Sequence, residues 1–263
     1  MLLDNAESLI KKTAMKREYN QVRDIKIYPH YLDHPEGSAL IECGKTRVIC
    51  TASIDEKVPK WMSKTGKGWV TAEYDMLPRA TGSRRNRDSY RGKINGRTQE
   101  ISRLIGRSLR SAINMKKLGE RMITVDCDVI QADGGTRTAS ITGGFVALAL
   151  AIRQLQVEGK LEQDPIIDHV AAISAGIVGG KPYLDLDYIL DSEADVDMNV
   201  IMTGGGRLTE VQGTGENATF TRDELNTLLD LSFDCLPQLV EIQKLAIDLP
   251  RDTDVKFVEL PRA

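Results

Sequence analysis

Two glycine-containing stretches carry an arginine at the start of a predicted helix, a combination that suits the binding of an anion. The first is Asp133-Gly134-Gly135-Thr136-Arg137-Thr138, between a predicted strand and a predicted helix. Glycines let backbone N–H groups converge there, the helix N-terminus favours negative charge, and Arg137 adds a forked cationic donor. The second is Gly96-Arg97-Thr98. Two such helix starts could hold one phosphate, although an ordinary turn capped by Thr138 accounts for the first stretch equally well.

Carboxylates are crowded in two other stretches, where they could hold a hard cation such as Mg²⁺. Residues 185–197 contain six carboxylates and no basic residue. Asp185 and Asp187 are predicted to share one face of a strand, with Asp191 a turn later. Such a cluster repels itself unless a cation or nearby arginines compensate it. The aspartates of Asp126-Cys127-Asp128 form a rival pair; spacing separates the two clusters little, and the richer acid count favours 185–197.

Positive charge is concentrated in one segment, which favours a polyanionic partner. Residues 79–110 contain ten Lys and Arg against two acids, a local charge of +8 in a chain of formal net charge −3. The first part, 79–97, is rich in Arg, Gly and Ser and is predicted to be a long loop. Arg103, Arg107 and Arg110 lie on the polar face of the helix that follows, where a solvated or oligomer-facing surface accounts for them.

Hydrophobic periodicity predicts the elements that must position these residues. Apolar side chains recur with helical spacing from Ile101 to Ile113, after a cap at Thr98, and residues 122–130 alternate as a strand does. Thr221-Arg222-Asp223-Glu224 is a capping box that opens a helix to about residue 232. Hairpins followed by helices occur twice, which predicts an α+β fold of two similar halves in one compact unit. The other predicted strands are 38–43, 46–53, 69–74, 170–178, 183–189, 198–203 and 207–212, and the other helices are 139–157 and 235–247.

Several common catalytic and cofactor motifs are absent from the sequence. Gly44-Lys45-Thr46 lacks the first glycine of a nucleotide-binding P-loop and runs into a predicted strand, and Gly66-Lys67-Gly68 lacks the third glycine of a dinucleotide fingerprint. Three histidines, with no hydrolase or zinc-protease motif, leave any catalysis to Arg and Asp. The four cysteines have no metal or redox spacing and are interpreted as reduced core residues.

Nothing in the sequence suggests export or membrane insertion. The start, Met1-Leu2-Leu3-Asp4, has an acid where a secretory signal has positive charge. The longest apolar run, 145–152, is far shorter than the roughly 20 residues of a bilayer-spanning helix. We therefore expect a cytoplasmic protein with no membrane partner.

Six motifs, in order and with the expected spacing, resemble the RNase PH family. The longest is the run of seventeen residues from Asp126 to Thr142, which includes the glycine stretch with Arg137. The resemblance extends from about Arg17 to Leu245 and favours the functional interpretation of the arginines over the structural one. The other five motifs are residues 68–74, 76–81, 96–98, 104–108 and 197–204.

The resemblance implies a phosphorolytic 3′-to-5′ exoribonuclease with a ribosomal-protein-S5-domain-2-like fold. It would assemble as a homohexamer, a trimer of dimers, and trim the 3′ extensions of tRNA precursors. Inorganic phosphate would be the co-substrate and nucleoside diphosphates the products, and the reverse reaction would add nucleotides. The resemblance assigns catalysis and Mg²⁺ to Asp185 and Asp191, six residues apart. It places phosphate on Arg97, Gly135, Thr136 and Arg137, and the RNA path would follow Arg79, Arg84, Arg85, Arg87 and Arg91.

We expect residues 17–248 to form the catalytic domain, with an N-terminal extension, 1–16, and a C-terminal tail, 249–263. At Met15-Lys16-Arg17 the sequence departs from the Asp-Gly-Arg with which the family usually opens. This departure puts the N-terminal contacts in question rather than the active site.

Two other functions remain open on the sequence alone. A metal-dependent hydrolytic exonuclease would use water and the same aspartates, but the anion site argues against it. A non-catalytic RNA-binding subunit of a ring would need neither set of residues. The presence of Arg97 and Arg137 together with Asp185 and Asp191 argues against this second alternative.

Overall fold

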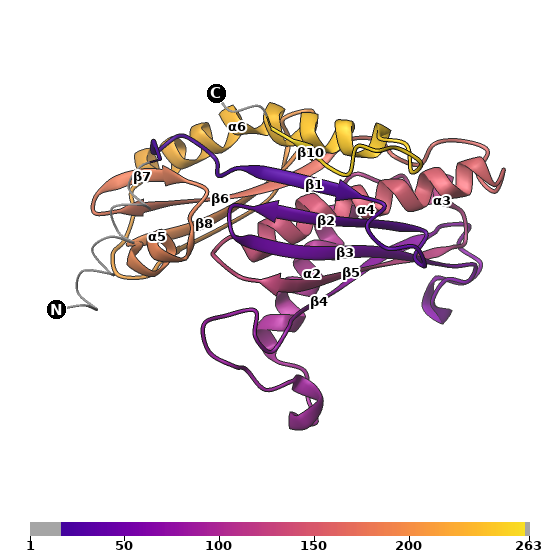
Figure 1. Cartoon of the computed structure of the whole chain (residues 1–263), viewed down its shortest axis with the longest axis horizontal. Coiled ribbons are helices and arrows are strands. Elements are labelled where there is room, and N and C mark those ends of the chain that lie inside the picture. Colours follow the sequence, from indigo (N-terminus) through magenta and orange to yellow (C-terminus); the bar gives the residue numbers. More distant parts are fainter. Residues whose placement is uncertain (1–16, 261–263) are drawn as a thin grey trace.

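Two β-sheets and the helices packed on them make up the protein (Figure 1). The structure is a computed structural model that describes residues 17–260, except the side chains of Ser89 and Arg91. The larger sheet has six strands in the order β10-β1-β2-β3-β5-β4, and its edge pair β4–β5 is parallel while its other pairs are antiparallel. Its strands are β1 (Ile25–Pro29), β2 (Gly37–Cys43), β3 (Thr46–Asp55), β4 (Trp69–Met76), β5 (Met122–Gln131) and β10 (Val258–Glu259).

The smaller sheet is antiparallel, with strands in the order β7-β6-β8-β9. Its long strands alternate with turns at Gly179-Gly180 and Gly204-Gly205-Gly206, as predicted. Its strands are β6 (Val170–Val178), β7 (Lys181–Leu184), β8 (Val196–Thr203) and β9 (Leu208–Gly215). The helices are α2 (Gly96–Arg110), α3 (Met115–Leu118), α4 (Thr136–Val157), α5 (Tyr188–Glu193) and α6 (Arg222–Asp248), with short 3₁₀ turns η1 (Lys60–Met62) and η2 (Asp88–Arg91).

Helix α4 is the centre of the core. It packs against β2 and β3 of the larger sheet, against β6 of the smaller sheet, and against α2 and α6. Residues on all its sides are buried, Phe145 and Leu148 completely, and a helix that is apolar all round belongs in an interior. By length and composition α4 could span a membrane, but 89% of its most apolar stretch is buried within the protein, as in the core helix of a globular fold.

The predicted α+β class is confirmed, whereas several predicted element boundaries are wrong. Helix α2 begins at Gly96, because the Asn95 side chain accepts the Arg97 N–H at 3.0 Å, so Thr98 lies within the helix and is not its cap. The capping box at Thr221 is confirmed, but the two predicted helices 221–232 and 235–247 are one helix that continues through Pro237. Buried residues on both sides of Pro237 pack α6 against β6, and such packing outweighs one lost backbone hydrogen bond.

Part of the predicted C-terminal tail, 249–263, belongs to the larger sheet. Val258 and Glu259 pair with Ile27 and Lys26 of β1. Phe257 packs against Tyr28, with ring centroids 5.0 Å apart. The predicted extension 1–16 lies outside the described residues.

Close contact between α4 and the larger sheet gives a prediction with a built-in control. A methyl group on Gly143 would lie 2.7 Å from Ile41 Cγ2 and 3.1 Å from Cys50 Sγ, whereas one on Gly144 would meet atoms at 3.4 Å or more. Overpacking costs about 1–3 kcal/mol. We expect Gly143→Ala to lower the free energy of unfolding by that amount and Gly144→Ala to leave it unchanged or raised, as measured by urea unfolding. Equal effects of the two substitutions would contradict this packing.

Candidate active site

The glycine turn between β5 and α4 is fixed in a left-handed conformation that only glycine adopts readily. Gly134 and Gly135 have φ of 77° and 65°. A side chain on Gly134 would lie 2.5 Å from the carbonyl oxygen of Leu186, so the turn packs directly on the segment before α5. Thr46 Oγ1 donates to the Gly134 carbonyl at 2.6 Å and accepts the Asp133 N–H at 2.9 Å. The turn is therefore held from both sides.

Helix α4 begins directly after this turn and presents free backbone donors. The first intrahelical bond runs from the Ala139 N–H to the Gly135 carbonyl at 3.0 Å, so the N–H groups of residues 136–138 have no partner within the helix. The predicted helix start at residue 139 is three residues late. The predicted cap, Thr138, instead donates its hydroxyl to the Gly135 carbonyl at 2.9 Å.

Arg97 and Arg137 reach the same region from two helices. Each stands in the first turn of its helix, α2 or α4. Arg137 Nη1 donates to Gln212 Oε1 at 3.3 Å, and among the described residues neither guanidinium lies within 4.0 Å of a carboxylate. Both arginines nevertheless lower the pKa of Asp191 and of Asp197. Two cations without close counter-ions thus face one pair of acids.

Asp191 and Asp197 form that pair, on α5 and β8. Burial raises the pKa of Asp191, and Arg97 and Arg137 offset part of the effect. Burial and the charge of Asp191 raise the pKa of Asp197 to about 6, again partly offset by Arg137. Glu216, after β9, adds to both shifts. Repulsion among these acids is the electrostatic signature of a site built to receive a cation or a proton.

Sequence reasoning gave Asp197 no role, although a signal for it was present. The six-residue spacing that relates Asp185 to Asp191 recurs from Asp191 to Asp197. Spacing could not choose between the two pairs. The structure brings Asp191 and Asp197 together with the arginines and places Asp185 elsewhere.

Asp185 is buried, and arginines occupy both oxygens of its carboxylate. Arg23 donates to Oδ2 from its backbone N–H and Nε, at 2.7 and 2.9 Å, and to Oδ1 from Nη2 at 2.7 Å. Arg17 Nη1 donates to Oδ2 at 3.1 Å. Burial by itself would raise the pKa of Asp185, but the charges and hydrogen bonds of Arg23 and Arg17 hold it at about 2. The catalytic and metal-binding roles of Asp185 stay predictions, and its geometry is that of an anchor.

The anchor explains why the predicted strand 183–189 is wrong. Strand β7 ends at Leu184, because the backbone of Asp185 is left-handed, with φ of 56°. Asp187 does not share a strand face with Asp185; its side chain caps α5 by accepting the N–H groups of Ile189 and Leu190. Arg23 also donates from Nη1 to the Asp133 carbonyl at 2.6 Å. One guanidinium therefore joins the glycine turn to the segment that leads into α5.

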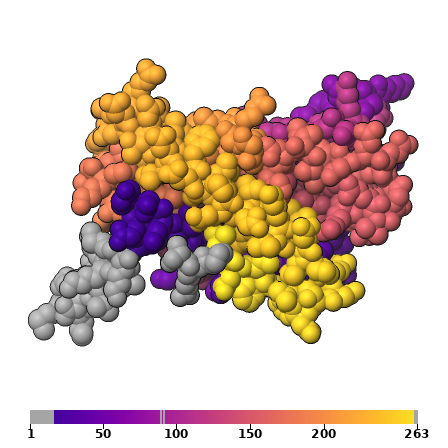
Figure 2. All heavy atoms as spheres, turned by 90° about the horizontal axis from the view of Figure 1, so that it is seen from above, coloured from indigo at the N-terminus to yellow at the C-terminus, as the bar shows by residue number. Residues whose placement is uncertain are grey.

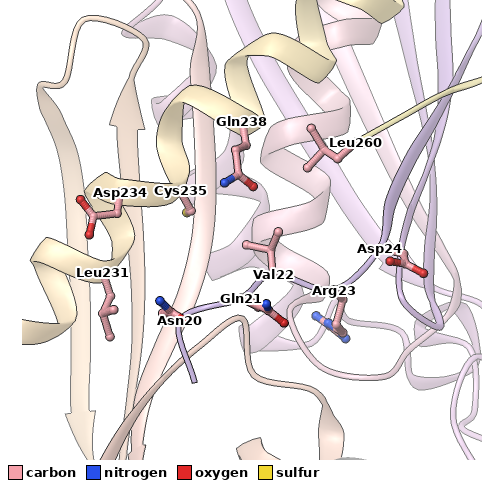
Figure 3. A pocket seen from close by; sticks show the side chains of 10 residues that line it. All are labelled: Asn20, Gln21, Val22, Arg23, Asp24, Leu231, Asp234, Cys235, Gln238 and Leu260. Carbon is pink, nitrogen blue, oxygen red and sulfur yellow. The ribbon is translucent and has the colours of Figure 1, made fainter. Parts of the chain in front are cut away.

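A pocket of about 430 Å³ lies beside Arg23, between the segment that leads into β1 and helix α6 (Figure 3). None of the residues predicted to bind phosphate or RNA lines it, so this pocket is separate from the arginine and acid site. Its walls are Asn20, Gln21, Val22, Arg23, Asp24, Leu231, Asp234, Cys235, Gln238 and Leu260.

The rival acids Asp126 and Asp128 lie away from the glycine turn. Their strand neighbours Val125 and Cys127 face the core, so both aspartates point to the opposite face of the larger sheet. Glu73 and Asp75 stand directly beside them on β4. Burial raises the pKa of both aspartates, and the carboxylates on β4 add to the effect. These four residues are called the outer-face acids below.

The predicted RNA-binding arginines lie on the loop between β4 and α2, which extends from the body of the protein (Figure 1). The loop starts directly after Met76, the last residue of β4, and ends at Asn95, two residues before Arg97. Arg85 pairs with Asp75 of the outer-face acids at 3.0 Å. Arg79, Arg84 and Arg87 are exposed, and the side chain of Arg91 lies outside the described part of the chain.

The anchor role of Asp185 gives a prediction about stability. Asp185→Asn removes one member of a buried ion pair and should lower the free energy of unfolding at pH 7 by about 3–5 kcal/mol. Because its folded pKa of about 2 lies below the unfolded value, this contribution is present above about pH 4 and is lost as the pH falls toward 2. Asp191→Asn, six residues away and with no arginine within 4.0 Å of its carboxylate among the described residues, is the control. Urea unfolding at pH 7 and pH 3 measures both, and equal losses would disprove the anchor.

Comparison with known proteins identifies the family of this chain. The model of a 3′ exoribonuclease family matches in two parts, domain 1 over residues 21–154 and domain 2 over residues 168–235. The chain is 59% identical over 230 residues to a ribonuclease PH of Bacillus pumilus, which covers 87% of this chain and 95% of that protein. It is 56% identical over 233 residues to a ribonuclease PH of Neisseria meningitidis, with 89% and 96% covered.

A solved structure supports the same fold at low sequence identity. The chain superposes on a chain of the Archaeoglobus fulgidus exosome with RNA bound to its active site, with a TM-score of 0.75 and 21% identity, over 89% of this chain and 96% of that one. The family match and the close relatives decide the assignment: the chain belongs to the RNase PH family of 3′ exoribonucleases.

Proposed function

We propose that the protein is a phosphate-dependent 3′-to-5′ exoribonuclease that trims the 3′ extensions of tRNA precursors. One observation carries the proposal: Arg97 and Arg137 flank the free N-terminus of α4 without close counter-ions, beside Asp191 and Asp197. A doubly charged anion suits two guanidiniums and a helix N-terminus. A nucleophile held there stands next to the acids that would manage the leaving group.

In the proposed reaction, inorganic phosphate is bound by Arg97, Arg137, the Thr136 hydroxyl and the turn at Gly135. An oxygen of this phosphate attacks the phosphorus of the last phosphodiester of the RNA. The bond to the 3′ oxygen of the preceding nucleotide breaks, that oxygen takes up a proton, and a nucleoside diphosphate leaves. Catalysis here is mainly alignment and charge neutralisation. The reverse reaction adds a nucleotide and releases phosphate.

Mg²⁺ fits the acids of this site. The ion prefers carboxylate oxygens, takes one or two from the protein, and keeps waters and substrate phosphates as its other ligands. Asp191 and Asp197, with their raised pKa values, would hold it, in place of the pair Asp185 and Asp191 that the family resemblance implied. When bound, the ion neutralises charge on the reacting phosphates.

The loop arginines Arg79, Arg84, Arg85, Arg87 and Arg91 would guide the RNA backbone to the site. Their loop joins the end of β4 to the start of α2, so it connects two elements that border the site. Contacts of this kind give affinity without sequence choice. We further propose a cytoplasmic homohexamer, as the family resemblance implies; the exosome chain above is itself part of a larger assembly.

Two alternatives are less well supported by the same site. A hydrolytic exonuclease would need the acids but would leave Arg97 and Arg137 without an anion. A non-catalytic RNA-binding subunit would have no use for Asp191 and Asp197, whose pKa values the fold raises.

The phosphate nucleophile predicts both the products and the effect of one arginine. Digestion of a 3′-extended RNA should require inorganic phosphate and release nucleoside diphosphates. Arg137→Ala should raise the KM for phosphate about 10- to 100-fold, the cost of one charged hydrogen-bond partner, and leave the RNA dissociation constant near that of the wild type. Arg153→Ala, an exposed arginine on the same helix α4, is the control. Monophosphate release without phosphate would mean hydrolysis.

The raised pKa of Asp197 predicts that this residue lowers the stability of the fold while it supports catalysis. Because the folded pKa of about 6 exceeds the unfolded value, the wild type loses stability as the pH rises from about 4 to about 6. Asp197→Asn should therefore be more stable than the wild type at pH 8 in EDTA, by about 1–3 kcal/mol, yet turn over at least about 100-fold more slowly.

Melting curves at pH 5 and pH 8 and single-turnover assays test this prediction. Added Mg²⁺ should raise the Tm of the wild type at pH 8 more than that of Asp197→Asn. Asp128→Asn, from the outer-face acids, should retain turnover. An active Asp197→Asn beside a folded but inactive Asp128→Asn would place catalysis on the other cluster.

A further inference from the structure

Tyr74 connects the larger sheet to the first residue of α4. It lies near the end of β4, it is only 5% exposed, and its ring faces the core. Its hydroxyl lies 2.9 Å from Thr136 Oγ1. Thr136 is half-buried at the N-terminus of α4, where the free backbone donors are. A buried phenol thus ends beside a residue of the anion site.

The surroundings of Tyr74 keep its hydroxyl protonated and close to both arginines. Burial raises the pKa of Tyr74, and the hydrogen bond between Tyr74 and Thr136 together with the charges of Arg97 and Arg137 offsets part of this rise. The phenol therefore remains a hydrogen-bond donor at neutral pH. Its neighbours also show that it lies within the electrostatic reach of both guanidiniums.

The Thr136 hydroxyl carries a single hydrogen, so the direction of its bond to Tyr74 decides what else it can do. If Thr136 donates to Tyr74, it has no hydrogen left for an anion. If Tyr74 donates to Thr136, the threonine hydrogen is free to point at an anion. A dianion between Arg97 and Arg137 favours the second arrangement, and donors in such a chain strengthen one another.

We infer that Tyr74 is a positioning residue for the phosphate, acting through the Thr136 hydroxyl. This inference rests on the proposed function. Tyr74 donates to Thr136 Oγ1, and Thr136 in turn donates to a phosphate oxygen at the start of α4. The aromatic ring fills the core as phenylalanine would, so only the hydroxyl serves the site.

Conservative substitutions separate the hydroxyl from the ring. Tyr74→Phe keeps the packing, Thr136→Val keeps the branched shape, and Thr136→Ser keeps the hydroxyl. With saturating RNA and varied inorganic phosphate, Tyr74→Phe should raise the KM for phosphate about fivefold, the effect of one neutral hydrogen bond, with kcat within about twofold of the wild type. Thr136→Val should raise this KM at least as much, and Thr136→Ser should stay closest to the wild type.

The double variant tests whether Tyr74 acts through Thr136. Once the threonine hydroxyl is gone, removal of the tyrosine hydroxyl should add nothing, so Tyr74→Phe with Thr136→Val should match Thr136→Val alone. Tyr28→Phe is the control, because the Tyr28 hydroxyl contacts Glu42 at 3.4 Å, on a different strand pair. It should leave the KM for phosphate unchanged.

Each other outcome overturns the inference in a recognisable way. If the KM for phosphate of the double variant rises by the product of the two single-variant increases, Tyr74 does not act through Thr136. An unchanged KM for phosphate with a lowered Tm would make the tyrosine hydroxyl purely structural. If the wild type itself releases nucleotides at full rate without phosphate, the proposed function fails, whatever Tyr74→Phe does.

Discussion

The buried ion pair between Arg23 and Asp185 is the interaction on which the arrangement of the site depends. Arg23 precedes the first strand of the larger sheet, and Asp185 follows a strand of the smaller sheet, 162 residues later. The same guanidinium reaches the Asp133 carbonyl in the glycine turn. Burying two charges is costly unless hydrogen bonds satisfy them, and here three donors of Arg23 and one of Arg17 do so. The two sheets, the turn and the segment before α5 are thereby fixed relative to one another.

Elements of both halves bring positively and negatively charged side chains together at the site. The larger sheet and its helices supply Arg97 and Arg137, and the smaller sheet and α5 supply Asp191 and Asp197. Each acid ionises less readily than usual because it is partly buried among other acids, and each arginine lacks a close counter-ion among the described residues. A fold that holds unsatisfied charges of both signs side by side sacrifices stability for pre-organised electrostatics. Bound phosphate would neutralise the arginines, and a bound divalent cation would neutralise the acids.

The sequence predicted the local features of this site and missed the long-range ones. The glycine turn with Arg137, and Arg97 at a helix start, follow from local motifs, and the structure brings them together. The alternation of side chains predicts a strand that holds both Asp185 and Asp187, because alternation cannot reveal a left-handed residue that ends the strand at Leu184. The role of Arg23 cannot be predicted from the sequence, because nothing in the neighbouring residues indicates a partner 162 residues along the chain. The same six-residue spacing relates Asp185 to Asp191 and Asp191 to Asp197, so spacing cannot choose between the two acid pairs. The position of Asp191 and Asp197 near Arg97 and Arg137 distinguishes them in the folded protein. The sequence also fails to predict that α6 is one continuous helix, because Pro237 disfavours a helix when only its local sequence is considered. Figure 2 shows this helix running over one face of the molecule, where its packing on the core outweighs the local preference.

Inorganic phosphate, held by Arg97 and Arg137, is the proposed nucleophile, and isotope transfer can show whether it enters the product. A 3′-extended RNA would be digested in phosphate labelled with ¹⁸O, and the released nucleotides analysed by mass spectrometry. The wild type should release nucleoside diphosphates whose β-phosphate carries the label, and Arg137→Ala should fail to form them at low phosphate. Unlabelled nucleoside monophosphates, or products that take their label from H₂¹⁸O instead, would show that water is the nucleophile.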